Sequence, residues 1–215
     1  MPKYHQSAAV IVAPKWFMVL VFLSLILASS RPVQAVEPSA GELVSNFHAV
    51  LLQTMKTAGK IGVKERYQKL QPTVSETFHL RVMMQVASGS HWRKASDEER
   101  DALENAFAQL TIATYATQFD GFSGQTFETL GTRDGPQKTT LVETRLQSPG
   151  GRSVDLVYVT RAFKGKWRVV DVLLDTGISE LARKRSEYRQ LLKSRGVSGL
   201  VNSLALKTKS LLGED

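Results

Sequence analysis

Cysteine is absent from all 215 residues of the chain. Without a thiol, the protein can form no disulfide, no cysteine nucleophile and no cysteine-ligated metal site. A domain of this length does not depend on disulfides, because it can bury roughly 70% of the surface that its unfolded chain exposes. The absence is therefore compatible with an exported protein that folds on its hydrophobic core alone.

Histidine is scarce, and the histidines do not cluster. The chain has four, of which His48, His79 and His91 follow residue 35. None of them has the His-Glu-x-x-His spacing or another ligand spacing that holds zinc. We therefore expect no metal site.

Catalytic motifs are missing as well. Gly121-Phe-Ser-Gly124 lacks the spacing of a nucleophile elbow, and Gly59-Lys60 and Gly165-Lys166 lack the flanking residues of a phosphate loop. Asp120 and Asp171 could form an acid pair. The favoured interpretation is that Asp120 is a loop carboxylate and that Asp171 accepts hydrogen bonds at the end of a strand. We expect no catalytic residue, no cofactor and a protein that is not an enzyme.

Long apolar runs are limited to one, near the N-terminus. Trp16–Ala28 spans 13 almost uninterrupted apolar residues, follows two lysines and precedes Val33-Gln34-Ala35. The run is shorter than the about 20 residues that cross a bilayer, and small residues in this arrangement suit a signal-peptidase site. We expect a cleaved signal peptide over residues 1–35 and a single domain over residues 36–215; an uncleaved membrane anchor is the alternative.

The net charge is positive but not concentrated. The chain carries a formal charge of +8 at pH 7, and three of its basic residues fall within the first 35 positions. The remaining basic residues are spread along the sequence, which favours solubility or attraction to anionic lipid over nucleic-acid binding. No nucleic-acid partner is expected.

Helical periodicity dominates both ends of the domain. Apolar residues recur every three or four positions, and Ser96-Asp-Glu-Glu99 forms a capping box with acids in the first turn. Met83 and Met84 are expected to fill the core, or alternatively to form an adaptable wall for apolar chains. The expected helices cover residues 43–55, 64–71, 72–89, 97–119, 180–195 and 199–212.

The middle of the chain alternates with a period of two instead. Four segments, over residues 127–132, 139–147, 153–163 and 167–174, are joined by three short turns rich in glycine. They predict an α+β fold with an antiparallel meander of four strands, or at most five, wrapped by amphipathic helices. Several strands are apolar on both faces, which requires a large core or an apolar ligand in an internal cavity.

Several short motifs, in this order along the chain, resemble the MlaC-like periplasmic lipid-binding proteins, also called the toluene-tolerance auxiliary family. They are Gly89-Ser-His-Trp92, Tyr115-Ala-Thr-Gln-Phe119, Trp167-Arg-Val-Val-Asp-Val172, Gly177-Ile-Ser179 and Arg185-Ser-Glu-Tyr-Arg189. Glu-Leu-Ala after Gly-Ile-Ser is most similar to the hopanoid-associated HpnM branch. The resemblance covers roughly residues 43–212.

This resemblance implies a periplasmic carrier of phospholipid or hopanoid. It also implies an inner-membrane ABC transporter with a membrane-anchored lipid-binding subunit as partner, and we expect a monomer. A carrier makes physical sense, because each methylene of a lipid tail that is exposed to water costs about 0.8 kcal/mol of free energy. A protein cavity avoids that cost while the lipid crosses an aqueous compartment. The alternatives are an enzyme that modifies a lipid in the same cavity, with Asp171 or a histidine, and a docking module that carries no ligand.

Two sets of residues follow as candidates for binding. A basic helix after Ser179 is expected to dock on acidic headgroups or an acidic partner through Arg185 and Arg189, although an ordinary solvated face is the simpler alternative. The strand pattern cannot say which sheet face lines a cavity. The expected lipid-contacting residues are Tyr115, Phe119, Phe127, Leu141, Leu156, Tyr158, Val170 and Val172.

Overall fold

The computed structural model describes residues 38–151, 153–175 and 177–214. The described residues belong to one compact unit, residues 37–215. The expected signal peptide and its cleavage after Ala35 lie outside the described residues. Over the described part of the chain, no helix is both long enough and apolar enough to cross a membrane.

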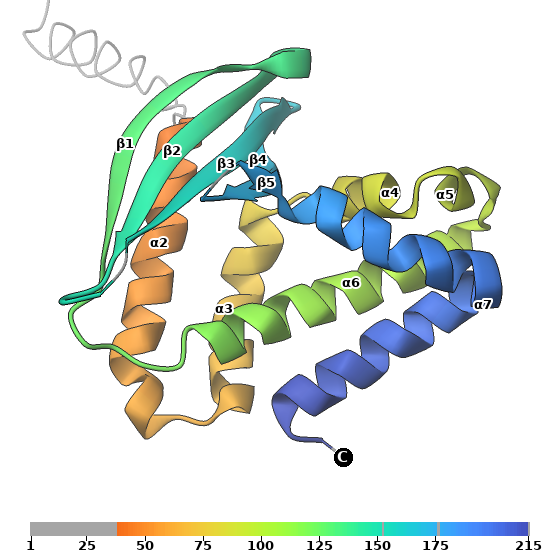
Figure 1. Cartoon of the computed structure of the whole chain (residues 1–215), viewed down its shortest axis with the longest axis horizontal. Helices are drawn as coiled ribbons and strands as arrows, with labels where there is room; N and C mark the ends of the chain where they lie inside the picture. Colours follow the sequence, from red (N-terminus) through yellow and green to blue (C-terminus); the bar gives the residue numbers. More distant parts are fainter. Residues whose placement is uncertain (1–37, 152, 176, 215) are drawn as a thin grey trace, which may run out of the picture. The chain divides into compact units, whose positions relative to one another are not determined.

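Five antiparallel strands form one sheet in the order β1-β2-β3-β4-β5 (Figure 1). Consecutive strands are neighbours throughout, so the expected meander is confirmed. The fifth strand has only two residues and pairs along the end of β4. The strands are β1 (Thr126–Gly135), β2 (Thr139–Gln147), β3 (Val154–Phe163), β4 (Lys166–Leu174) and β5 (Ile178–Ser179).

Helices precede and follow the sheet and gather on one side of it (Figure 1). The first long helix packs against four of the five strands, and the last one packs on α6 and α4. The helices are α2 (Ala40–Thr57), α3 (Val63–Thr77), α4 (Leu80–Ser88), α5 (Ser90–Lys94), α6 (Asp97–Gln118) and α7 (Glu180–Leu212), with 3-10 turns η1 (Ala58–Lys60) and η2 (Pro136–Lys138).

The boundary between α3 and α4 differs from the expected one. Pro72 does not begin a helix but lies inside α3, and the break falls later, at Phe78. Phe78 is extended and bridges to Val169 of β4, while the His79 N–H donates to the Val169 carbonyl at 2.9 Å. Pairing with a strand distant in sequence therefore ends α3, so residues near position 78 do not predict this helix end.

The start of α6 and the break inside α7 lie where the sequence predicts them. Ser96 Oγ accepts from the Glu99 N–H at 3.2 Å, and the Glu99 carboxylate accepts from the Ser96 N–H at 2.9 Å. At Gly196 the backbone leaves the helical region, with φ 64° and ψ −165°. The two parts of α7 fold back on each other at this point (Figure 1), as the expected stop at Gly196 predicts.

Two β-bulges change which side chains face the helices. One lies at Leu130 in β1, and the other lies at Val170 in β4, between the partners of Val159 and Thr160. An extra residue reverses the alternation along the strand beyond it. In β4, Val169 and Val172 consequently both face the helices and are buried, while Val170 has no cross-strand partner.

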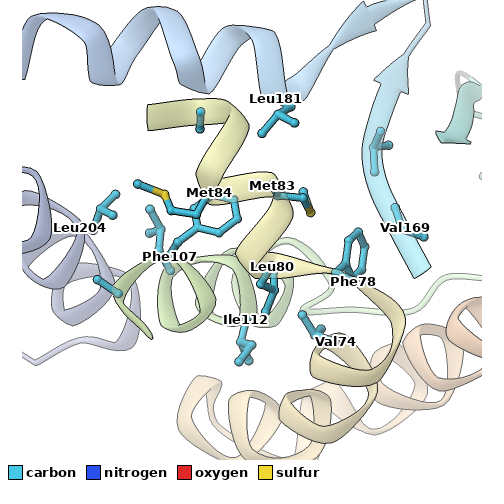
Figure 2. Close-up of a cluster of buried hydrophobic side chains, with 14 of the residues drawn as sticks. Val74, Phe78, Leu80, Met83, Met84, Phe107, Ile112, Val169, Leu181 and Leu204 are labelled. Atoms are coloured by element: carbon cyan, nitrogen blue, oxygen red, sulfur yellow. The ribbon is translucent and has the colours of Figure 1, made fainter. Parts of the chain in front are cut away.

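A single apolar core lies between the helices and the side of the sheet that faces them. Figure 2 shows that Met84 points toward Phe107 and Leu204, whereas Met83 lies on the side of α4 nearer to Phe78 and Val169. Met84 is fully buried and fills the core, the simpler of the two roles expected for it.

Candidate functional site

An apolar cavity of about 180 Å³ lies at the junction of the sheet with α4, α6 and the start of α7. Alternate residues of β3 and β4 form one wall, because Leu156 and Tyr158 pair across the strands with Leu174 and Val172. The opposite wall is one face of α6, from Phe107 to Phe119. Aromatic and aliphatic side chains thus enclose most of the cavity, as is usual for small-molecule sites.

Five residues that the sequence suggests as lipid contacts line this cavity together. They come from two distant segments of the chain: Tyr115 from α6 and Phe119 from its C-cap, and Leu156, Tyr158 and Val172 from the sheet. The four-residue spacing places Tyr115 and Phe119 on one helix face, and the spacing of two places Leu156 and Tyr158 on one sheet face. Their roles in lipid binding remain predictions.

Phe127 shares the helix-facing side of the sheet but does not line the cavity. Its ring stacks on His48 of α2, with 3.9 Å between centroids and 13° between planes. It also lies 6.3 Å from the ring of Phe119. Phe127 therefore supports the cavity wall from behind.

Leu141 and Val170 are not placed as expected. Leu141 pairs with Val159 and Arg133, which puts it on the face of the sheet that is turned away from the helices, and it lies outside the main core cluster. Val170 is the bulge residue of β4, so regular alternation with Val172 does not hold for it. A simple alternation of two cannot anticipate a bulge. In β2, by contrast, Leu141 shares its face with Glu143 and Arg145, so alternation alone could have placed it on the polar side of the strand.

Several residues around the cavity were not among the expected contacts. Phe107, Thr111 and Thr114 continue the face of α6 that carries Tyr115, so helical periodicity alone could have found them. Phe78 and Met83 were hidden by the misplaced boundary between α3 and α4. Met83 lines the cavity, which corresponds to the alternative role considered for the methionine pair.

Behind Tyr158, a buried polar pair joins the sheet to α2. His48 Nε2 and the Tyr158 hydroxyl are 2.9 Å apart, and His48 is 3% exposed. Burial lowers the pKa of His48 to about 4 and raises the pKa of Tyr158 well above its usual value. Both groups are consequently neutral near pH 7, and each satisfies the other's hydrogen bond in a place without charge.

Asp171 is a hydrogen-bond acceptor at the end of β4. Its carboxylate accepts from the Ser179 hydroxyl, from the Leu181 N–H at 3.1 Å and from the Val172 N–H at 2.8 Å. Ser179 in turn caps α7 by accepting from the Ala182 N–H at 2.8 Å. These bonds join β4 to the first turn of α7, in agreement with the favoured interpretation of this aspartate.

The opening of the cavity is charged, and α7 supplies the charges. Arg183 donates to the carboxylates of Glu180 and Glu187, each at 2.6 Å. Lys184 lines the opening with its ammonium 5.9 Å from the centroid of the Phe107 ring. The opening thus combines a compensated arginine with a lysine that contacts an aromatic face.

The two arginines expected to dock a partner are exposed on the first part of α7. The Arg185 guanidinium lies next to Gly89, at the junction of α4 and α5. Arg189 borders a shallow surface hollow with Lys193. Neither side chain lines the cavity, so any role in docking is separate from contact with a ligand inside it.

Metal ligands do not cluster in the part of the chain that the structure describes. No group of three or more histidine, aspartate or glutamate side chains is suitably placed to hold an ion there. The buried His48 is already paired with Tyr158, and His79 Nδ1 accepts from the Val82 N–H at 3.4 Å at the start of α4.

Comparisons with known proteins agree with this architecture. A solved structure of the phospholipid-binding protein from Ralstonia solanacearum, in complex with a phospholipid, matches with a TM-score of 0.71 and 21% sequence identity. The match covers 81% of this chain and 99% of the other, and at this identity it supports the shared fold. The sequence model of the MlaC protein family matches residues 45–206. The chain therefore belongs to the MlaC family.

Proposed function

We propose that the protein is a periplasmic carrier that binds a phospholipid or a hopanoid and passes it between membrane complexes. The apolar cavity between the sheet and α6 carries this proposal, because it offers acyl chains an environment similar to the bilayer interior. Membership of the MlaC family and the fold shared with a phospholipid-binding protein support it. Exchange between bilayer and cavity would be nearly neutral in free energy, so partners must supply the direction.

The cavity must enlarge when a lipid enters. Its volume of about 180 Å³ is below the roughly 300–1,000 Å³ typical of small-molecule sites. A second hollow of about 230 Å³ lies between α6 and α7, and both hollows are bordered by Thr114, Gln118, Arg183 and Lys184. Movement of these side chains would join the two spaces, so we infer that α7 is the adjustable wall.

A substitution that fills the cavity tests the proposal. Leu156→Trp places a large ring where an acyl chain would lie, so lipid recovered per folded protein should fall by at least half. Val157→Trp is the matched control, because Val157 is adjacent in β3 but points to the other face. Mass spectrometry of extracted lipid and the melting temperature are measured for both variants.

The result discriminates between a carrier and an ordinary core. Overpacking a filled core costs about 1–3 kcal/mol of stability. If Leu156→Trp loses stability while its lipid content is unchanged, the cavity is not the binding site. Lipid returned chemically altered by the wild-type protein would instead favour an enzyme.

Docking on a membrane complex would use the exposed face of α7. We propose that Arg185 and Arg189 contact an acidic surface of an inner-membrane ABC transporter or of its membrane-anchored lipid-binding subunit. Reversing both charges to glutamate should weaken binding to inner-membrane vesicles severalfold at low salt, where electrostatic attraction is least screened. Lys60→Glu with Lys94→Glu is the control, since both lysines are exposed elsewhere. Equal binding by both double variants would leave α7 as an ordinary solvated face.

The cellular location follows from the same proposal. We propose that the chain is exported to the periplasm and that the mature protein begins at Val36. The short apolar run and the small residues before Val36 support cleavage there.

A further inference from the structure

Lys184 occupies an unusual place for a lysine, on the side of α7 that faces α6. It lies between Leu181 and Tyr188, both of which are buried on that side of the helix. Its side chain borders both the apolar cavity and the neighbouring hollow between α6 and α7. Burial lowers the pKa of Lys184, and the adjacent Arg183 guanidinium acts in the same direction. The protein therefore holds a cation in a place that disfavours charge.

Two carboxylates near Lys184 act to raise its pKa, but both are engaged by Arg183, and the net effect of burial and the neighbouring cations is to lower it. Glu180 and Glu187 are both hydrogen-bonded to Arg183. Lys207, which borders the same hollow from the far part of α7, adds a further positive charge. Within the described residues, Lys184 forms no ion pair, and its ammonium lies over the face of the Phe107 ring. An aromatic face attracts a cation but does not cancel its charge.

One other polar group on this side of α7 lacks a partner within the described residues. The hydroxyl of Tyr188, one helical turn from Lys184, is buried without a hydrogen bond among the described residues. Gln118 borders both hollows and provides an amide at the exposed end. A half-buried cation without a partner is unfavourable unless another group supplies the missing interaction.

A phosphate group would complete this arrangement. Its oxygens accept hydrogen bonds only, and lysine is a common phosphate ligand. The apolar cavity begins beside the ammonium, so a molecule with an anionic head and apolar tails would match both parts at once. We propose that Lys184, assisted by Lys207, binds the phosphate of a phospholipid whose acyl chains occupy the cavity. This inference rests on the proposed carrier function and selects phospholipid over an uncharged hopanoid.

A pair of lipids with identical tails tests the assignment. Delipidated protein is mixed with equal amounts of dipalmitoylphosphatidylglycerol and dipalmitoylglycerol, which lacks the phosphate, and the complexes are counted by native mass spectrometry. The wild-type protein should prefer the phospholipid by about tenfold or more, the range expected for a hydrogen bond between charged groups. Lys184→Met should bring the preference close to one while binding of dipalmitoylglycerol continues.

Two further variants separate the charge from the fold. Methionine retains the apolar stem over Phe107, so Lys184→Met should unfold at or above the wild-type temperature. Lys184→Arg keeps a cation and should keep the preference. Lys193→Met removes a lysine that is exposed on the same helix and should leave the preference unchanged.

The outcomes have distinct meanings. A preference retained by Lys184→Met would overturn the assignment, as would binding of inorganic phosphate that depends on Lys184 but is unaffected by lipid. Failure of the wild-type protein to bind either lipid would overturn the carrier function itself. Loss of preference in Lys184→Met alone, with dipalmitoylglycerol still bound, would establish Lys184 as the phosphate-binding residue.

Discussion

At the scale of single residues, His48 shows how the fold accommodates a polar group in its core. The imidazole stacks on Phe127 and lies within hydrogen-bonding distance of Tyr158, so it links α2 to β1 and β3. Both partners stay neutral, which avoids the large desolvation penalty of a buried charge. The same burial makes this link sensitive to acid.

The stability of the protein should therefore fall between about pH 6.5 and pH 4. Burial lowers the pKa of His48 to about 4 in the folded protein, so the unfolded chain takes up a proton first as the pH falls. The contribution is complete above the unfolded pKa and is lost as the pH falls toward the folded one, by about 3 kcal/mol in all.

His48→Gln isolates this contribution. Glutamine does not titrate, and its amide can still bond to Tyr158, so the variant should show a shallower dependence of unfolding free energy on pH. His79, whose pKa burial also lowers, remains in both proteins and cancels in the comparison. Urea unfolding at pH 7, 6, 5 and 4.5 measures the difference; parallel pH profiles for the two proteins would contradict the assignment to His48.

At the scale of secondary-structure elements, two irregularities determine how the elements pack: a bulge in β4 and a break in α7. The bulge at Val170 lets Val169 and Val172 both face the helices, and the break at Gly196 folds the second part of α7 back on the first. Gly196 has φ 64° and ψ −165°, a region that is essentially reserved for glycine. Gly199 is also needed, because a Cβ there would collide with the side chain of Arg195.

Gly196→Ala should destabilise the protein by about 1–3 kcal/mol. A Cβ at this position meets no neighbouring atom, so backbone strain is the whole cause. Gly59→Ala serves as the control: a Cβ also fits there, and φ is not positive. The control should be neutral or slightly stabilising. Urea unfolding compares the two variants, and equal free energies of unfolding would show that α7 does not depend on this turn.

At the scale of the whole domain, a curved sheet covered by helices on one side encloses a cavity smaller than its proposed ligand. An acyl chain that replaces empty space adds contacts to the folded state but not to the unfolded one. Bound lipid should consequently raise the melting temperature. Ligand at a concentration of 100 times its Kd stabilises the folded state by about 2.7 kcal/mol. This stabilisation corresponds to a rise in melting temperature of roughly 5–10 °C for a domain of this length.

Removal and return of lipid test this effect. Protein stripped of lipid should melt several degrees below the protein as purified, and added phospholipid should restore the difference. Leu156→Trp should melt at the same temperature with and without added lipid, because its cavity is filled. A wild-type melting temperature that is independent of lipid would show that the cavity does not take up the ligand.

Local features of the chain are sufficient for much of the architecture. The capping box at Ser96, the glycine at 196 and the period-two segments predict α6, the break in α7 and the meander, because each depends on neighbours within a few positions. The same periodicities place Tyr115, Phe119, Leu156 and Tyr158 on the faces that line the cavity.

Only the tertiary structure decides the rest, because it depends on residues distant in sequence. Phe78 ends α3 by pairing with β4, and the bulge at Val170 determines that Val169 rather than Val170 faces the helices. Leu141 lies on the face of β2 that carries Glu143 and Arg145, and the packing of α2 on the sheet leaves that face outside the cavity. The isolation of Lys184 beside the cavity likewise arises from the packing of α7 on α6, since its neighbours in sequence show only a basic helix.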